Sequence, residues 1–196
     1  MKRIFDVVAS GLGLVAVSPI FLILAIWIKL DSKGPVFYKQ MRVGRKNRDF
    51  QLYKFRSMRT GSDKKGLITV GGRDPRVTPV GYYIRKYKLD ELPQLINVFI
   101  GDMSIVGPRP EVRQYVDLYT PEQMQVLSVR PGITDLASIR YHNENELLEQ
   151  AEDPEKYYRK VVMPDKLKIN REYINKASFW FDIRLIFCTL WTIIKK

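Results

Sequence analysis

The chain has 196 residues, enough for one domain with attachments, and 45% of them are apolar, which is enough for a core and argues against a disordered chain. Its single cysteine, Cys188, excludes a disulfide framework and a cysteine-based zinc site, and its single histidine, His142, argues against serine–histidine–aspartate catalysis and histidine-rich metal sites. The net charge is +12, and the 17 cations and four anions of residues 29–89 form a basic block that indicates a nucleic acid, an anionic membrane surface or phosphorylated substrates.

The N-terminal segment contains an apolar stretch, residues 7–28, of 22 residues without a charge. As a helix it would be about 33 Å long, enough to cross the roughly 30 Å hydrocarbon core of a bilayer. Ser18 and Pro19 lie at its middle, where proline removes a helix hydrogen bond and the serine hydroxyl can bond a freed carbonyl. Cations at residues 2–3 and at Lys29 flank it, and positive charge resists translocation. These residues leave a spanning helix and a re-entrant helix broken at Ser18-Pro19 both open.

The middle of the chain predicts short strands and several helices. Residues 36–38 and 50–55 alternate apolar and polar side chains, as short strands do, with a basic turn at 42–47 between them. Residues 61–79 are rich in Gly, Pro, Asp and Thr and predict a long loop, of a kind that is often functional. The remaining expected elements are helices at about 80–88, 93–100 and 121–129, a rigid segment at 104–110, a turn at 131–134 and a solvated helix with its cap at 144–155.

The C-terminal end, residues 179–194, gathers aromatic and aliphatic side chains around Asp182 and Arg184 before two terminal lysines. Tryptophans beside terminal lysines are typical of an interfacial helix, and a helix that docks on the core explains the pattern about as well. We expect an α+β protein that is mostly helical. Its expected divisions are a membrane helix at 1–30, a globular domain with short strands at 31–177 and an amphipathic interfacial helix at 178–196.

Two adjacent acids, Asp90 and Glu91, follow the basic block and precede Pro93 at a predicted helix start. Proline is tolerated in the first turn of a helix, so both carboxylates should lie near the positive end of a helix dipole, close to Arg85. This setting lowers the pKa of a carboxylate. A helix N-cap with a first-turn acid explains the pair on local grounds, and a phosphate site with a divalent metal is the functional alternative.

Three cations outside this pair are candidates for phosphate binding. Arg109 stands between two prolines that fix the backbone, and a guanidinium recognises phosphate bidentately. Pairing of Arg109 with Glu111 or Asp102 is the structural alternative. Lys54 and Arg56 lie two residues apart on a predicted strand and should share one face, where simple solvation is the alternative.

Short motifs along nearly the whole chain occur in a specific order. They are Lys2-Arg3-Ile4-Phe5-Asp6, Ser18-Pro19, Tyr53-Lys54-Phe55-Arg56-Ser57-Met58, Leu89-Asp90-Glu91-Leu92-Pro93-Gln94, Gly101-Asp102-Met103-Ser104, Val106-Gly107-Pro108-Arg109-Pro110 and Arg130-Pro131-Gly132-Ile133-Thr134. This set resembles the bacterial sugar transferase family, the monotopic polyprenol-phosphate phosphoglycosyl transferases, and the length resembles its minimal members.

The resemblance implies an enzyme at the cytoplasmic face of the bacterial inner membrane, monotopic, with a re-entrant helix broken at Ser18-Pro19. It implies transfer of a phospho-sugar from a UDP-sugar to polyprenol (undecaprenyl) phosphate with Mg²⁺ and release of UMP, as the first membrane step of a glycoconjugate pathway such as that of an exopolysaccharide or lipopolysaccharide. Asp90 is then the nucleophile of a covalent intermediate, and Glu91 positions the metal or manages a proton, with both acids as candidate metal ligands. The expected substrate contacts are Lys54, Arg56, Arg85, Arg109 and Arg130.

One departure from the family pattern concerns residues 135–138, which read Asp-Leu-Ala-Ser where many relatives have Gly-Trp-Ala-Gln. It implies a different local surface, so the sugar identity does not carry over. Anionic membrane lipids are expected partners and nucleic acid is not; a homodimer is one option for the oligomeric state. Two rival functions are a membrane-tethered nucleic-acid binder, motivated by aromatic residues among the cations, and a non-catalytic membrane adaptor.

Overall fold

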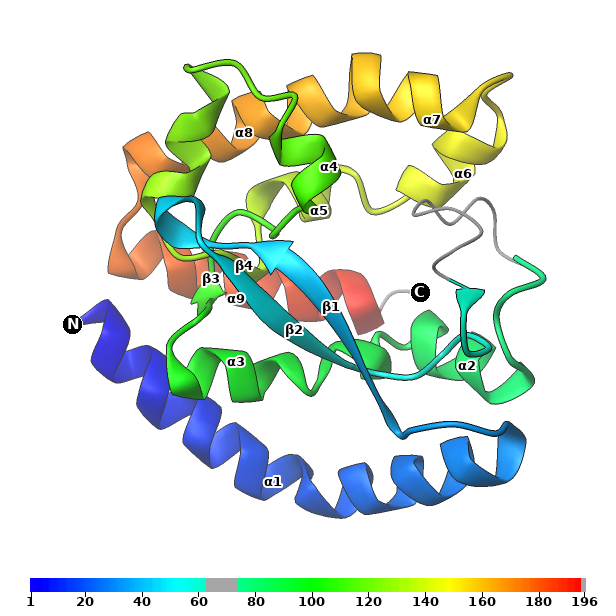
Figure 1. Ribbon diagram of the computed structural model, residues 1–196. Helices are drawn as coiled ribbons and strands as arrows, with labels where there is room; N and C mark the ends of the chain where they lie inside the picture. The colour runs from blue at the N-terminus through cyan, green and yellow to red at the C-terminus, as the bar shows by residue number, and fades with distance from the viewer. Residues whose placement is uncertain (63–73, 195–196) are drawn as a thin grey trace.

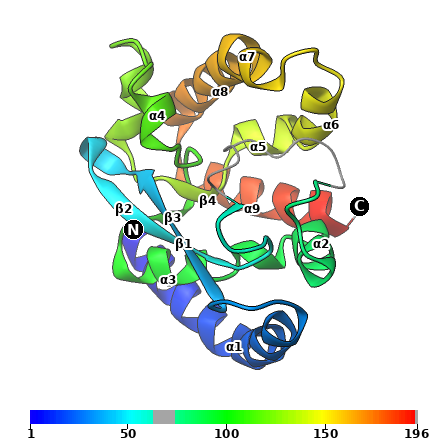
Figure 2. The ribbon, with the colours of Figure 1, turned by 45° about the vertical axis from the view of Figure 1, so that its right-hand side comes forward.

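The computed structural model describes residues 1–62 and 74–194, so residues 63–73 of the predicted loop lie outside the described part. This part is mostly helical, with two small sheets of two strands each, which confirms the expected α+β composition. Figure 1 shows α1 (Lys2–Asp31) along one side of the molecule and α8 (Met163–Lys176) along the opposite side. Between them lies α9 (Phe179–Ile194), and Figure 2 shows the same order after rotation.

Helix α1 is continuous through Ser18-Pro19, which differs from the predicted break. Pro19 has no N–H to donate to the carbonyl of Val15, and the Ser18 hydroxyl donates to that carbonyl instead, at 2.8 Å. The helix is bent into an arch whose two ends turn toward the rest of the chain (Figure 1). The proline therefore curves this helix without interrupting it.

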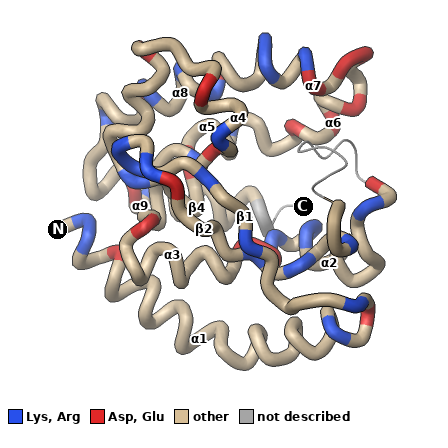
Figure 3. The backbone as a smooth tube through the Cα atoms, in the orientation of Figure 1, with Lys and Arg blue, Asp and Glu red and all other residues tan. Residues whose placement is uncertain are grey.

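The long apolar stretch of α1 remains largely uncovered. Among the described residues, it is the one helix long and apolar enough to cross a membrane, and 11% of its most apolar window is buried. Figure 3 shows charges near its two ends and uncharged residues between them. A face this apolar and this exposed requires an apolar partner or a lipid environment.

The start of α1 is anchored by polar contacts. Arg3 donates to two carbonyls in the last turn of α3 (Gln94–Ile100), at 2.6 and 2.9 Å. The buried carboxylate of Asp6 accepts from a hydroxyl and a backbone N–H of β3, both at 3.1 Å. Lys2 pairs with Asp182 of α9. Charged residues at the head of an apolar helix therefore attach it to the globular part.

An antiparallel hairpin pairs β1 (Phe37–Val43) with β2 (Asp49–Phe55) across the short turn η1 (Arg45–Asn47). Both expected strands are present, although β1 is longer than predicted and includes the first residues of the expected basic turn. The register places Arg42 of β1 on the same face as Lys54 of β2.

A second, parallel pair joins β3 (Ser104–Val106) to β4 (Gly132–Thr134). The prediction of a turn at residues 131–134 was therefore wrong, because a Pro-Gly sequence signals a turn locally while a distant strand provides its ladder partner. A side chain at Gly132 would lie 2.1 Å from the backbone nitrogen of Gly107, so the approach of these segments requires glycine.

The other helices surround these two sheets. Their bounds are α2 (Pro79–Lys86), η3 (Leu89–Glu91), α4 (Arg113–Val116), η4 (Gln123–Ser128), α5 (Leu136–Arg140), α6 (Glu144–Glu149), α7 (Pro154–Tyr157) and the π-helical turn η5 (Tyr158–Val162). The helices expected at 80–88 and 93–100 are confirmed as α2 and α3. The segment expected as a helix at 121–129 is the 3₁₀ helix η4.

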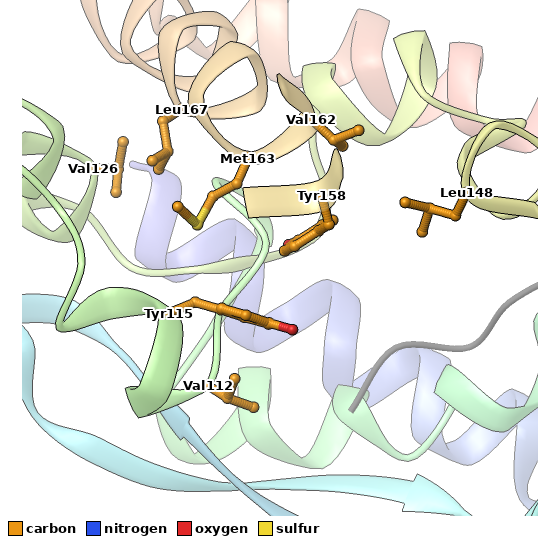
Figure 4. Close-up of a cluster of buried hydrophobic side chains, with 8 residues drawn as sticks. All are labelled: Val112, Tyr115, Val126, Leu148, Tyr158, Val162, Met163 and Leu167. Atoms are coloured by element: carbon orange, nitrogen blue, oxygen red, sulfur yellow. The ribbon is translucent and has the colours of Figure 1, made fainter. Parts of the chain in front are cut away.

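Helices α7 and α8 join through the wide turn η5, which ends two residues before Pro164. Proline cannot donate the next helical hydrogen bond, and a π turn accommodates that loss. Figure 4 shows that this turn places Tyr158 opposite Tyr115 of α4 within a buried cluster, and their ring centroids are 5.1 Å apart. The cluster supports one wall of the cleft described next.

Candidate active site

A cleft of about 580 Å³ opens between the hairpin, the α2–α3 region and the helices α5, α6, α8 and α9. Ligand sites commonly have volumes of about 300–1,000 Å³. Its charged side is lined by Arg42, Lys54, Arg85, Lys86, Lys88, Asp90, Glu91 and Arg109. The two acids predicted from sequence therefore do lie in a concave site, among cations.

Helices α2 and α3 position the acids through a sharp change of chain direction. Lys88 has a left-handed backbone, with φ 57° and ψ 20°, just before the turn η3 that carries Asp90 and Glu91. For a residue other than glycine this backbone conformation is less favourable by roughly 1–2 kcal/mol. Local strain of this kind often occurs at functional sites, and here it separates α2 from α3 and turns the two carboxylates into the cleft.

Glu91 is held firmly by two cations. Arg109 binds its carboxylate through both terminal guanidinium nitrogens, one of them at 3.0 Å, and Lys54 donates to it at 3.1 Å. Burial raises the pKa of Glu91, but Arg109 and Lys54 more than offset this, and the pKa lies well below its usual range. Glu91 is therefore an ionised structural partner of the cations. Arg109 pairs with neither of the acids considered from sequence spacing.

Asp90 is in a different situation, although it is the adjacent residue. It is 6% exposed, and within residues 1–62 and 74–194 its carboxylate forms no ion pair like that of Glu91. Burial raises the pKa of Asp90, Lys54 lowers it and the charge of Glu91 raises it further, with a net shift above the ordinary value. The predicted lowering of this pKa was wrong, because burial outweighs the cations and α3 is a helix of only seven residues.

The cations of the site respond to the same burial. Burial lowers the pKa of Lys54, and Glu91 only partly restores it. The charge of Glu91 raises the pKa of Arg109 above its usual value. Arg109 is therefore the permanent cation of this group, and Lys54 is the one whose charge depends more on an anion nearby.

Two predicted substrate contacts lie outside the cleft. Strand β2 ends at Phe55, so Arg56 does not share a face with Lys54; its guanidinium donates to two carbonyls at the C-terminal end of α1, at 3.1 and 2.6 Å. Arg130 donates to a carbonyl at the C-terminal end of α3, at 2.9 Å. Both arginines therefore bind carbonyls at the C-terminal end of a helix, where the helix dipole favours a cation. The structure brings together Lys54, Arg85 and Arg109.

A divalent cation fits this site through one of the two acids. Mg²⁺ in proteins is commonly held by one or two carboxylates together with substrate phosphates. Both oxygens of Glu91 are engaged by Arg109 and Lys54, so Asp90 is the carboxylate left for a metal. No cluster of three or more His, Cys, Asp or Glu side chains suitable for a metal occurs among the described residues.

Several cleft residues were not predicted from sequence. Arg42 lies beside Glu111 at 3.5 Å, and burial lowers its pKa. The hydroxyl of Tyr158 donates to Glu111, and Lys166 pairs with Glu144 at 2.8 Å. The alternation of β1 would have placed Arg42 on the face of Lys54, but Tyr158 and Lys166 come from distant helices and carry no local signal.

The departure at residues 135–138 has a structural explanation. Asp135 is fully buried and caps α5, accepting from the backbone N–H and hydroxyl of Ser138 at 2.8 and 2.6 Å. An aspartate in this position satisfies an otherwise unpaired N–H at the start of a helix. Ser138 also lines the cleft, so the altered sequence changes the wall through a helix start.

Comparison with known proteins gives the family. The model of the bacterial sugar transferase family matches residues 1–196. UDP-N-acetylgalactosamine-undecaprenyl-phosphate N-acetylgalactosaminephosphotransferase of Aeromonas hydrophila is 40% identical over 99% of this chain and 44% of its own length. UDP-glucose:undecaprenyl-phosphate glucose-1-phosphate transferase of Escherichia coli (strain K12) is 38% identical over 97% of this chain and 39% of its own length.

A third relative is of similar length to this chain. The exopolysaccharide production protein PSS of Rhizobium leguminosarum bv. phaseoli is 38% identical over 97% of this chain and 93% of its own length. The chain belongs to the bacterial sugar transferase family. It spans less than half of the length of the Aeromonas and Escherichia relatives.

Proposed function

We propose that this protein transfers a phospho-sugar from a UDP-sugar to undecaprenyl phosphate and releases UMP. The observation that carries the proposal is the division between two adjacent acids: Glu91 is bound by Arg109 and Lys54, whereas the buried Asp90 is left available in the cleft. The names of the Aeromonas and Escherichia relatives, which describe transfer from UDP-sugars to undecaprenyl phosphate, support this choice of substrates.

In this mechanism Asp90 is the nucleophile. An oxygen of its carboxylate forms a bond to the β-phosphorus of the UDP-sugar, and the bond from that phosphorus to the bridging oxygen breaks, with UMP as the leaving group. An oxygen of undecaprenyl phosphate then attacks the same phosphorus and releases the Asp90 carboxylate. The two displacements leave the protein unchanged and join the phospho-sugar to the lipid.

The surrounding side chains assist by charge and position. Arg109 and Lys54 are fixed by Glu91 beside the reacting carboxylate, and Arg85 lines the same cleft, so cations face the diphosphate as negative charge develops. Asp90 would hold a bound Mg²⁺ together with substrate phosphates, and the ion would supply charge neutralisation of the diphosphate. Glu91 thereby acts as the residue that orients the cations.

We further propose that α1 is re-entrant at the cytoplasmic face of the bacterial inner membrane. Its exposed apolar length and its arch, whose ends both turn toward the globular part, support this arrangement (Figure 1). With a membrane-impermeant thiol reagent, cysteines introduced at Lys2 and Lys33 in a Cys188→Ser background should both be labelled in inverted vesicles and neither should be labelled in intact spheroplasts. Labelling from opposite sides would show a spanning helix instead.

Replacement of Asp90 tests the reaction directly. Asp90→Asn should abolish both UMP release from a UDP-sugar and the mass increase of the phospho-sugar adduct in the intact protein. Asp49→Asn is a matched control, because Asp49 is exposed and pairs with Arg113 far from the chemistry. Full UMP release by Asp90→Asn would contradict the mechanism. Absence of UMP release from the unaltered protein with every UDP-sugar tested, together with salt-dependent oligonucleotide binding, would favour the nucleic-acid alternative.

A further inference from the structure

The walls of the cleft differ in chemistry on either side of Asp90. Toward α6 and α8 the lining is polar and charged, with Glu111, Glu144 and Lys166 among its members. Toward α3 and α9 it is apolar, and this apolar wall consists of Leu92, Leu95, Ile105, Ile133, Ile139, Ile186 and Leu190. A ligand that spans the whole cleft therefore needs one polar end and one hydrocarbon end.

The hydroxyl groups on the apolar wall are already satisfied. Thr134 and Thr189 bond to each other, and Thr189 also donates to a carbonyl of its own helix at 2.9 Å. Thr192 donates to another carbonyl of α9 at 2.8 Å. Their hydroxyls are used within the protein, so this side offers little to the many hydroxyls of a sugar or a ribose.

The apolar wall is backed by the protein-facing side of α1. The side chain of Leu95 lies against α1, since a Cβ added at Gly13 would be 3.4 Å from its Cδ1 atom. Leu92 packs against a buried cluster that includes Leu24 and Ile28 of α1. These α3-side residues therefore line the cleft and contact the apolar helix.

Helix α9 completes this connection from the other side. Ile186 faces the cleft and packs into a buried cluster, while Leu190 lines the cleft and is also 51% exposed, which places it at the mouth. Phe187 and Trp180 lie on the outer part of the same helix, with 67% and 78% of their surface exposed. Apolar surface therefore runs from the buried cleft wall to the exterior over Leu190.

We propose that the apolar wall binds the first isoprene units of the polyprenyl phosphate acceptor, with Leu190 as the residue over which the rest of the hydrocarbon chain leaves for the lipid. This inference rests on the proposed function and adds the route of the acceptor tail. The acceptor phosphate lies at the cations beside Asp90, and the tail lies on the apolar wall, whose threonine hydroxyls are bonded within the protein. The polar side remains for the nucleoside and sugar.

Photolabelling tests the route without catalysis. A polyprenyl phosphate with a photoreactive group in its first isoprene units is irradiated with the full-length protein in nanodiscs, and labelled peptides are mapped by mass spectrometry. Adducts on Leu95, Ile186 or Leu190 that are competed by undecaprenyl phosphate are expected. Adducts restricted to Phe187, Trp180 or the outer face of α1 would overturn the route.

Kinetics with matched variants provide the second readout. Leu190→Gln should raise the KM for undecaprenyl phosphate roughly tenfold, a difference of about 1.4 kcal/mol, while Phe187→Gln should change it less than about twofold. Exchange of labelled UMP into the UDP-sugar needs no lipid and should be equal in both variants and the unaltered protein. Equal KM increases in both variants would overturn the route and leave the proposed function standing. Failure of UMP exchange in the unaltered protein would instead overturn the proposed function, and the photolabelling would still decide the route.

Discussion

Replacing Arg109 with alanine should destabilise the protein through the carboxylate of Glu91. The guanidinium makes two hydrogen bonds to that carboxylate, and Lys54 makes a third contact at 3.1 Å. The side chains of Glu91 and Arg109 are 13% and 30% exposed, so water can only partly replace the lost partner. Removing Arg109 therefore leaves a mostly buried anion with one cation instead of two.

The expected cost follows from these contacts. Breaking a buried ion pair costs roughly 3–5 kcal/mol when the remaining charge has no partner. Lys54 remains beside Glu91 and Arg109 is partly exposed, so we expect about 2–3 kcal/mol for Arg109→Ala. For a domain of this size that corresponds to a decrease in the unfolding midpoint of roughly 4–12 °C. Arg109→Lys keeps the charge but loses the bidentate geometry, and about half of this decrease is expected.

Thermal unfolding of the purified protein in nanodiscs measures this effect. Arg113→Ala is the matched control, because Arg113 pairs with Asp49 where their side chains are 38% and 44% exposed. Exposed pairs contribute about 0.2–1 kcal/mol, so its midpoint should move by no more than about 4 °C. If Arg109→Ala and Arg113→Ala lowered the midpoint equally, the buried pairing of Arg109 with Glu91 would be refuted. UMP release by Arg109→Ala should also fall by about 10²–10³-fold.

Three further predictions concern the acids and the packing of α2. At neutral pH, Asp90→Asn should raise the unfolding midpoint and Glu91→Gln should lower it. Burial raises the folded-state pKa of Asp90, so ionisation of this residue destabilises the protein as the pH rises above the unfolded-state pKa. The cations hold the folded-state pKa of Glu91 low against burial, so its ionised form stabilises the protein until the pH falls through that folded-state pKa. Midpoint shifts of the same sign would contradict this. The rate of UMP release should decline on the acid side at a pH above the ordinary aspartate pKa of about 3.9, and an acid limb at or below that value would argue against a raised pKa for Asp90. Gly81→Ala should lower the free energy of unfolding by about 1–3 kcal/mol, because the new Cβ would lie 2.0 Å from a backbone carbonyl oxygen. Gly13→Ala should leave it nearly unchanged, because the nearest contact of its Cβ would be at 3.4 Å. Calorimetry of both variants compares these two helical glycines.

Elements with a local signal were predicted well. The apolar run of α1, the alternation of β1 and β2 and the proline-bounded helices α2 and α3 all carry their pattern in consecutive residues. Strand β4 was missed because three residues after a Pro-Gly turn form a strand only when β3 lies beside them. The continuity of α1 was missed because the Ser18 hydroxyl replaces the hydrogen bond that Pro19 cannot make.

The site was only partly accessible to sequence reasoning. Asp90 and Glu91 stood out because they are adjacent and follow many cations, and the structure places both in the cleft. The pairing of Arg109 with Glu91 was not predicted, because Glu91 lies 18 residues earlier in the chain. Arg56 illustrates the opposite error: its motif predicted substrate contact, but the end of β2 turns it toward the C-terminal carbonyls of α1.

The apolar helix, the basic block, the acidic pair and, through the order of the motifs, the family can all be read from the amino-acid sequence. The different roles of the two acids depend on how the chain folds. Glu91 lies within reach of Arg109 and Lys54, while Asp90 is buried without such partners among the described residues, so two neighbouring carboxylates have pKa values shifted in opposite directions. Charge interactions and desolvation depend on distances and burial, and packing brings together residues from β2, η3 and the segment after β3 that are far apart along the chain.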